Sequence, residues 1–372
     1  MDVKTVVLER YSQGAKARQS DLCCPVDYDT ELLALIPEEI RDKDYGCGDP
    51  SRYVREGDVV LDLGSGAGKI CYMAAQVTGA RGLVIGIDMN DDMLALARKY
   101  QAAMAAKLGG DRVRFVKGQI EDLALDVEAM ERYLAGHPVR TASEYAGLQD
   151  WQRRQRREAP LIPDESVDLV VSNCVLNLVA DEHKRQLIHE IHRVLKPGGR
   201  VAISDVVSDE PVPERLKRDP ELWSGCLAGV FQEEAFLRAF ADAGFLAVAY
   251  DKWEAKPWRV IENVEFRSVT LTAVKGTGEP ELDGGHAVIY RGPYASIADD
   301  QGHVYPRGAR IAVSERSFRL LTEGPYRKDF IGIEPAQRRE PKPFCLPAGS
   351  RRAPAETKGA RHATGSPAGG CC

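Results

Sequence analysis

The fold is decided by the stretch Val59-Val60-Leu61-Asp62-Leu63-Gly64-Ser65-Gly66-Ala67-Gly68. A short apolar run that ends in a glycine cluster is typical of a buried strand followed by a tight turn. The glycines allow the backbone to come close to a ligand, and a helix predicted from Ile70 to Val77 offers its unpaired N–H groups to that ligand. A dinucleotide-binding fingerprint requires its third glycine at position 69, where Lys69 stands, so the loop departs from that pattern.

Strands and helices alternate on the C-terminal side of this loop. The apolar patterns predict strands at 82–88, 113–116, 167–172 and 200–204, and helices at 91–108 and 180–195. Such alternation predicts an α/β fold with a doubly wound, mostly parallel sheet. Asp88 ends the second strand, where its carboxylate is well placed to accept hydrogen bonds from both ribose hydroxyls of a nucleoside.

Changes of composition divide the chain into parts. Residues 1–55 are predicted to form an N-terminal cap segment that contains cysteines, and residues 56–275 the main domain. Within that domain, residues 124–163 form a polar insertion rich in Arg and Glu, for which one or two solvated surface helices or a binding surface are the alternatives. Residues 276–335 have Gly-rich turns between short β-like runs, which predicts a small C-terminal subdomain. Residues 336–372 are rich in Pro, Ala, Gly and Arg and are predicted to be disordered.

Charge and hydropathy exclude several classes of protein. A net charge of -6 argues against a nucleic-acid binder. No apolar run approaches the ~20 residues of a membrane span, and the first residues lack the apolar stretch of a signal peptide. We therefore expect a cytoplasmic protein that uses neither nucleic acid nor a membrane.

The nine cysteines are more than packing alone requires. In a reducing cytoplasm they are expected to act as ligands, nucleophiles or redox partners, and the absence of a C-x-x-C pair argues against a zinc knuckle. Cys174 follows the fourth strand, where ligands of open parallel sheets bind. Cys47, Cys71 and Cys226 are each predicted near the same edge, although a buried packing role remains the alternative for Cys174.

The set of Asp62, the glycine loop and Asp88 resembles the class I S-adenosylmethionine-dependent methyltransferases. The resemblance implies their Rossmann-like fold and S-adenosylmethionine as cofactor; another nucleotide in a Rossmann-like domain is the alternative. Asp62 is expected to meet the amino group of the cofactor directly or through water, Asp88 to bind the ribose, and Met89 to pack on the adenine. The expected cofactor site is completed by Tyr45, Gly64, Ser65, Gly66, Ile120, Glu121 and Asn173.

Four segments carry a narrower resemblance, to the arsenite methyltransferases: residues 45–48, 61–71, 172–178 and 223–229. The likeness extends over about residues 8–335, and Cys23-Cys24 fits a vicinal pair of that family. It implies methylation of trivalent arsenic that is bound by Cys174 and Cys226, with Cys47 as the third ligand. It also implies a Cys47–Cys71 disulfide that thioredoxin or glutathione reduces, and a monomer. The insertion 124–163 departs from the family pattern.

The chemistry that this resemblance implies requires no general base, because arsenic has no proton to lose. The alternatives are a class I methyltransferase for an organic acceptor with incidental cysteines, and a protein that sequesters metalloid without catalysis. Cys23-Cys24 are expected either to capture metalloid or to have no role, and the same alternatives hold for Cys371-Cys372. Cys345 is interpreted as incidental.

Overall fold

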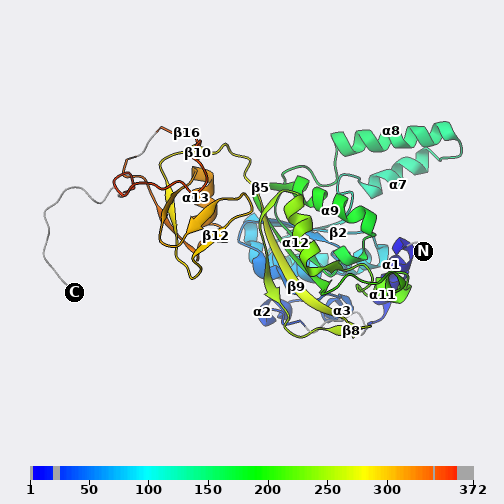
Figure 1. Ribbon diagram of the computed structural model, residues 1–372. Helices are drawn as coiled ribbons and strands as arrows, with labels where there is room; N and C mark the ends of the chain where they lie inside the picture. Colours follow the sequence, from blue (N-terminus) through cyan, green and yellow to red (C-terminus); the bar gives the residue numbers. More distant parts are fainter. Residues whose placement is uncertain (1–2, 20–25, 338–339, 358–372) are drawn as a thin grey trace. The chain divides into compact units, whose positions relative to one another are not determined.

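The computed structural model describes residues 3–19, 26–337 and 340–357 of the chain (Figure 1). The chain divides into two compact units, the first ending at Gly276 and the second beginning at Thr277. The sequence predicts this boundary at 275/276. Cys23, Cys24, Cys371 and Cys372 lie outside the described residues.

A central sheet with the strand order β3-β2-β1-β4-β5-β9-β7 forms the framework of the first unit. Its parallel strands are β1 (Val59–Leu63), β2 (Leu83–Asp88), β3 (Val113–Lys117), β4 (Val167–Asn173) and β5 (Leu195–Ser208). β9 (Val264–Lys275) and β7 (Phe245–Trp253) continue the sheet antiparallel, and β6 (Phe231–Gln232) and β8 (Arg259–Ile261) pair at its margin. This order confirms the predicted doubly wound, mostly parallel sheet. The order reverses between β1 and β4, and such a switch point is where ligands bind in open sheets.

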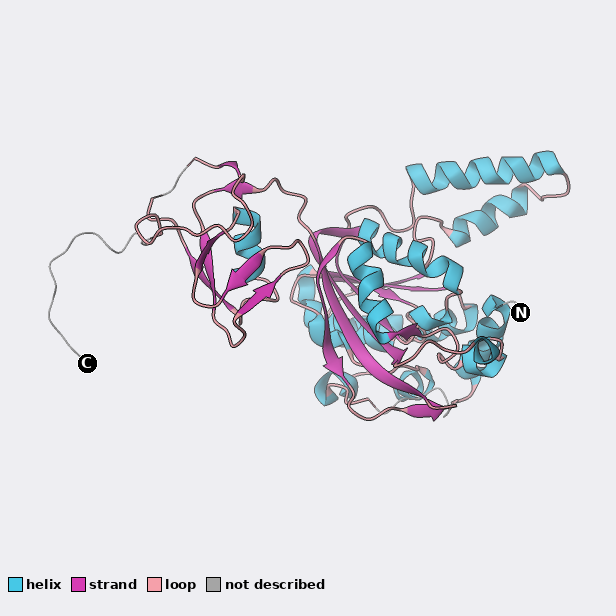
Figure 2. Cartoon of the chain, viewed as in Figure 1, coloured by secondary structure: helices cyan, strands magenta, loops and turns pink. Residues whose placement is uncertain are grey.

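Helices cover both faces of the sheet (Figure 2). They are α4 (Lys69–Thr78), α5 (Asp91–Lys99), α6 (Gln101–Leu108), α9 (Asp181–Val194) and α12 (Glu233–Asp242). The single helix predicted over 91–108 is thus two, which meet at Tyr100.

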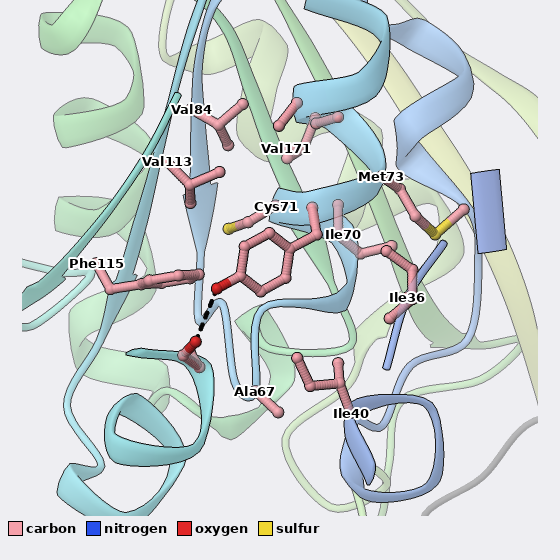
Figure 3. Packing of buried hydrophobic residues seen from close by; sticks show 14 of the residues in the cluster. Ile36, Ile40, Ala67, Ile70, Cys71, Met73, Val84, Val113, Phe115 and Val171 are labelled. Atoms are coloured by element: carbon pink, nitrogen blue, oxygen red, sulfur yellow. Dashed lines mark hydrogen bonds between the residues drawn. The ribbon is translucent and has the colours of Figure 1, made fainter. Parts of the chain in front are cut away.

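Two apolar clusters pack between these helices and the sheet. In β1 the side chains alternate, because Val60 belongs to the first cluster and Leu61 and Leu63 to the second. Figure 3 shows part of the first cluster, where Val84 and Val113 of neighbouring strands lie beside Cys71 of α4. Burial on both faces explains why the strands read as continuous apolar runs.

Shorter elements precede or connect these strands and helices. They are α1 (Val3–Lys16), α2 (Thr30–Ala34), α3 (Glu38–Lys43), η2 (Pro50–Tyr53), η3 (Gly79–Arg81), η4 (Leu176–Leu178), α10 (Glu214–Lys217) and α11 (Pro220–Ser224). Within the part of the chain that the structure describes, no helix combines the length and the apolar character needed to cross a membrane.

The insertion 124–163 forms two helices, α7 (Val127–Gly136) and α8 (Ala142–Glu158), which Figure 1 shows next to each other. A capping box of Thr141 and Glu144 begins α8. The ring of Tyr133 on α7 stacks on Trp151 of α8 with the ring centroids 4.8 Å apart. No residue of either helix is buried, so the aromatic stack holds the pair together at the surface.

The second unit has a small core of its own, built from a three-stranded sheet and one helix. Its elements are β10 (Leu282–Asp283), β11 (Ala287–Tyr290), β12 (Ser296–Ala298), β13 (Val304–Pro306), β14 (Arg310–Ala312), α13 (Glu315–Thr322), β15 (Phe330–Ile333) and β16 (Lys342–Pro343). The described part of the predicted tail differs from the expectation of disorder. β16 pairs with β10, and Arg352 is buried and forms an ion pair with Asp283. The ion pair between Arg352 and Asp283 thus stabilises a segment that has few apolar residues.

Candidate active site

A cavity lies at the switch point of the sheet, between the glycine loop, the ends of β2 and β4, and helix α1. Among the residues predicted to bind a cofactor, those that line it are Tyr45, Gly64, Gly66, Asp88, Met89, Ile120, Glu121 and Asn173. Asp62 and Ser65 are not in the lining and are buried. The structure therefore brings together eight of the ten predicted positions and places the other two out of the lining.

Glycine is required in the loop because its backbone is left-handed at Gly64 and Gly66, with φ of 67° and 53°. A Cβ at Gly64 would lie 2.4 Å from a methyl of Val175. Asp88 holds this conformation, because its Oδ2 accepts a hydrogen bond from the N–H of Gly66 at 2.8 Å and its Oδ1 from that of Asn90 at 2.8 Å. Burial raises the pKa of Asp88, and these N–H donors oppose that rise. The carboxylate thus both shapes the loop and lines the cavity.

Asp62 and Cys71 form a buried pair. The thiol of Cys71 donates to Oδ2 of Asp62 with the two atoms 3.2 Å apart. Burial raises the pKa of Asp62 to about 8, and burial together with the neighbouring Asp62 raises the pKa of the Cys71 thiol. A Cβ added to Gly86 would lie 2.7 Å from the Cys71 sulfur, so the thiol is packed against β2. Cys71 is therefore a neutral, enclosed thiol.

The other three predicted cysteines share one cluster beyond the ends of β4 and β5. Cys47 and Cys174 form a disulfide with their Cα atoms 5.8 Å apart. The thiol of Cys226 donates to the carbonyl of Cys174 at 3.2 Å, and Tyr11 of α1 brings its hydroxyl to 3.7 Å from the Cys226 sulfur. Cys174 also lines the cavity, so the sulfur cluster and the cavity are contiguous.

The implied Cys47–Cys71 disulfide is not the one that this structure contains. Cys47 is joined to Cys174, whereas Cys71 is a free buried cysteine. The two sulfurs belong to different apolar clusters, because Cys71 points from α4 into the sheet and Cys47 lies beyond its edge. Three of the four predicted cysteines therefore share one cluster, and Cys71 lies in another.

Asn173 fastens the loop that carries Cys47 to the end of β4. Its Oδ1 accepts hydrogen bonds from the N–H groups of Cys47 at 2.9 Å and Gly48 at 3.0 Å, and its Nδ2 donates to the Gly48 carbonyl at 2.9 Å. Gly46 has no room for a side chain, because a Cβ there would lie 2.2 Å from Nδ2 of Asn173. Ser268 adds a hydrogen bond to the Cys47 carbonyl at 2.5 Å. These contacts fix Cys47 beside Cys174.

Asp205 is a functional candidate that the sequence analysis missed. It lies on β5, is 1% exposed, and places a carboxylate oxygen within 4.8 Å of the sulfurs of Cys47 and Cys174. Burial raises its pKa to about 7. Its position at the end of a parallel strand is the same signal that singles out Asp88 and could have found it. The lining contributed by α1, which includes Lys4 and Tyr11, has no comparable motif.

Comparison with known proteins agrees with the two-unit division. A family described as a methyltransferase domain matches residues 55–133 and 152–244, and a domain family of unknown function matches residues 277–362. An arsenite methyltransferase of Aquipseudomonas alcaligenes is 30% identical, over 84% of this chain and 84% of its own length. The arsenite methyltransferase of Homo sapiens is 30% identical, over 81% of this chain and 74% of its own. A crystal structure of an arsenic(III) S-adenosylmethionine methyltransferase from Chlamydomonas reinhardtii superimposes with a TM-score of 0.57 at 27% identity, covering 87% of this chain and 100% of that one.

Proposed function

Because this chain belongs to the arsenite methyltransferases, we propose that it transfers a methyl group from S-adenosylmethionine to trivalent arsenic held by cysteine thiolates. One observation carries the proposal. Cys47, Cys174 and Cys226 come from distant segments and meet in one cluster, and Cys174 also lines the cavity next to the glycine loop. A soft, thiophilic acceptor held by these sulfurs is thereby next to the cofactor site.

The lining of the cavity suits S-adenosylmethionine, which carries positive charge and, when bound, supplies an electrophilic methyl group. Carboxylates of Asp44 and Asp88 line it, and both are buried enough for burial to raise their pKa. A cationic ligand would favour their ionised forms. We assign ribose recognition to Asp88, adenine packing to Met89 and Ile120, and the methionine part to the glycine loop. Asp62 is buried outside the lining, so we assign it an indirect role, through water, at the amino group of the cofactor.

The three sulfurs would hold arsenic with its lone pair directed at the methyl group, so that catalysis is largely positioning. Cys174 and Cys226 would be two of the ligands and Cys47 the third. The Cys47–Cys174 disulfide must be reduced before arsenic binds, since both sulfurs are otherwise consumed.

The electrons can be balanced within the same cluster. Methyl transfer formally oxidises arsenic from As(III) to As(V). Two thiolates that leave arsenic together as a disulfide return two electrons to it. Water or a thiol that loses a proton then takes the vacated position, which gives a neutral trivalent methylarsenical. We propose Cys47 and Cys174 as this pair, in place of Cys47 and Cys71. A thiol reductant such as thioredoxin or glutathione would then reopen the disulfide by exchange, in the cytoplasm, and the enzyme would serve arsenic detoxification.

The test is methyl transfer from labelled S-adenosylmethionine to arsenite in the presence of a thiol reductant. The native chain is expected to give methylated arsenic, and Cys174→Ser is expected to lose at least about 100-fold in rate, because a hydroxyl is a poor ligand for a soft centre. Cys345→Ser is the matched control, since Cys345 is exposed and belongs to the second unit. No methylated arsenic from a native chain that binds the cofactor would overturn the proposal and favour an organic acceptor.

A further inference from the structure

We propose that the carboxylate of Asp205 stabilises the positive charge that develops on arsenic during methyl transfer. The inference rests on the proposed function and deepens it, because it adds a charge-stabilising residue to the three sulfur ligands. Its starting point is a buried carboxylate that lies beside the sulfurs and, among the described residues, forms no ion pair.

Asp205 is held by neutral donors alone. Its Oδ1 accepts hydrogen bonds from Nδ2 of Asn177 at 2.7 Å and from the N–H of Val206 at 2.8 Å. Its Oδ2 receives a long contact of 3.4 Å from the N–H of Asn177, and the backbone N–H of Leu176 also donates to the carboxylate. Over residues 3–19, 26–337 and 340–357, no Lys, Arg or His forms an ion pair with it. The charge of Lys184 lowers the pKa of Asp205 without forming an ion pair with it, and its ammonium is engaged by Asp181 and the carbonyl of Gly229. Burying a carboxylate without a hydrogen-bonded counter-charge is costly, so the site is suited to a cation that is present only during the reaction.

The reaction supplies such a cation. Arsenic bound by three thiolates is neutral, and its lone pair forms the new arsenic–carbon bond. The bond between the methyl carbon and the cofactor sulfur breaks, and its electron pair stays on that sulfur, which becomes a neutral thioether. The positive charge therefore moves from sulfur to arsenic, and the product is a methylarsonium before the thiolates leave. No proton is gained or lost in this step.

Asp205 is the carboxylate placed to meet that charge. Within the described residues, the one cluster of three possible metal-ligating groups consists of Cys47, Cys174 and Asp205, whose ligand atoms all lie within 4.8 Å of one another. Asp62 is engaged by Cys71 and Asp88 by the glycine loop, so neither faces the sulfur cluster. A preorganised charge in a dry site interacts more strongly with the transition state than with the neutral ground state, which raises the rate without tightening the binding of arsenite.

Asp205→Asn tests the proposal while preserving the fold. The asparagine Oδ1 keeps both short hydrogen bonds, and its Nδ2 replaces the oxygen that has the long contact with the N–H of Asn177. The measurements are single-turnover methyl transfer at saturating S-adenosylmethionine, the arsenic retained per chain after gel filtration, and the cofactor Kd. We expect the single-turnover rate to fall about 100-fold, as for loss of one preorganised electrostatic group, with arsenic retention and Kd unchanged. Asp205→Glu retains the charge and is expected to lose less.

The outcomes separate the two proposals. A native chain that methylates no arsenite refutes the proposed function itself. An Asp205→Asn variant that transfers methyl at the native rate overturns the role of Asp205. A variant whose rate falls only in proportion to the arsenic that it retains also overturns it, since the residue would then serve binding alone. Equal losses in Asp205→Asn and Asp205→Glu, with retention intact, would show that geometry and not charge matters.

Discussion

Replacing Asn173 by alanine removes the amide that fastens the Cys47 loop to the sheet. Two backbone N–H groups, those of Cys47 and Gly48, lose their acceptor, and the Gly48 carbonyl loses its donor. Asn173 is 6% exposed, so water has little access to the groups that are left behind. The change therefore acts on one contact between segments that lie 126 residues apart in the sequence.

The expected loss follows from the three hydrogen bonds. Each contributes about 1 kcal/mol net, so Asn173→Ala should lower the free energy of unfolding by about 3 kcal/mol. The same bonds keep Cys47 next to Cys174 when the two thiols are reduced. At about 1.4 kcal/mol per factor of ten, the equilibrium constant for the Cys47–Cys174 disulfide should fall roughly tenfold to 100-fold. The lower end of this range applies if the hydrogen bond from Ser268 to the Cys47 carbonyl still keeps the loop in place.

Two assays measure these effects. Urea unfolding under reducing conditions gives the free energy of unfolding without a contribution from the disulfide, and titration with reduced and oxidised glutathione gives the disulfide equilibrium. Ser172→Ala is the matched control, because Ser172 is the preceding residue of β4 and its hydroxyl donates once, to the carbonyl of Leu63 at 3.0 Å. The control should cost about 1 kcal/mol and leave the disulfide equilibrium unchanged. If Asn173→Ala unfolds like the native chain and titrates with the same glutathione midpoint, the loop does not depend on this amide.

Three further changes test the cofactor side of the site. Asp88→Asn should raise the Kd for S-adenosylmethionine at least about tenfold in equilibrium dialysis, because loss of the charge weakens both ribose binding and the bond from Gly66. Gly86→Ala should lower the free energy of unfolding, measured by urea titration, by about 1–3 kcal/mol, because the new Cβ would lie 2.7 Å from the Cys71 sulfur. A native-like free energy would mean that the thiol can move aside. Burial raises the pKa of Asp62 to about 8, so between about pH 4 and 8 the folded chain binds more protons at this residue than the unfolded chain does. The stability of the cofactor-free protein should therefore fall as the pH rises through this range. Asp62→Asn should flatten the profile of Tm against pH.

The sheet was predictable from the sequence because its central strands are buried on both faces. Runs such as Val59 to Leu63 have no polar residue apart from Asp62, so strand and glycine turn are apparent without tertiary information. The end of β5 was harder to predict. The expected strand stops at Ser204, whereas the observed one continues to Ser208, paired with β9 over its whole second half. Asp205 directly follows the expected strand, so the rule applied to Asp88 could have indicated it, whereas its pairing with Val269 of β9 could not be predicted locally.

The partners of the cysteines could not be predicted, because they depend on where loops close. Position at a strand end correctly indicates that Cys174 faces the cavity. Which thiol reaches it depends on the contacts of Asn173 with the Cys47 loop, and no local pattern encodes them. The enclosure of Cys71 likewise follows from the missing side chain of Gly86 on a neighbouring strand.

The backbone at the sulfur cluster provides an independent argument for its function. Cys174 and Cys226 have φ of 60° and 62°, in the left-handed region where residues other than glycine are strained, at a cost on the order of 1–3 kcal/mol each. Hydrogen bonds to the surrounding structure stabilise this backbone conformation. The N–H of Cys174 donates to the Ser204 carbonyl at 2.8 Å, and the N–H of Cys226 donates to the Trp223 carbonyl at 3.0 Å. Glycine would satisfy this backbone at lower cost, but it has no sulfur. Two strained cysteines in one cluster are therefore better explained by the use of their thiols than by packing, and the incidental-cysteine alternative accounts for neither.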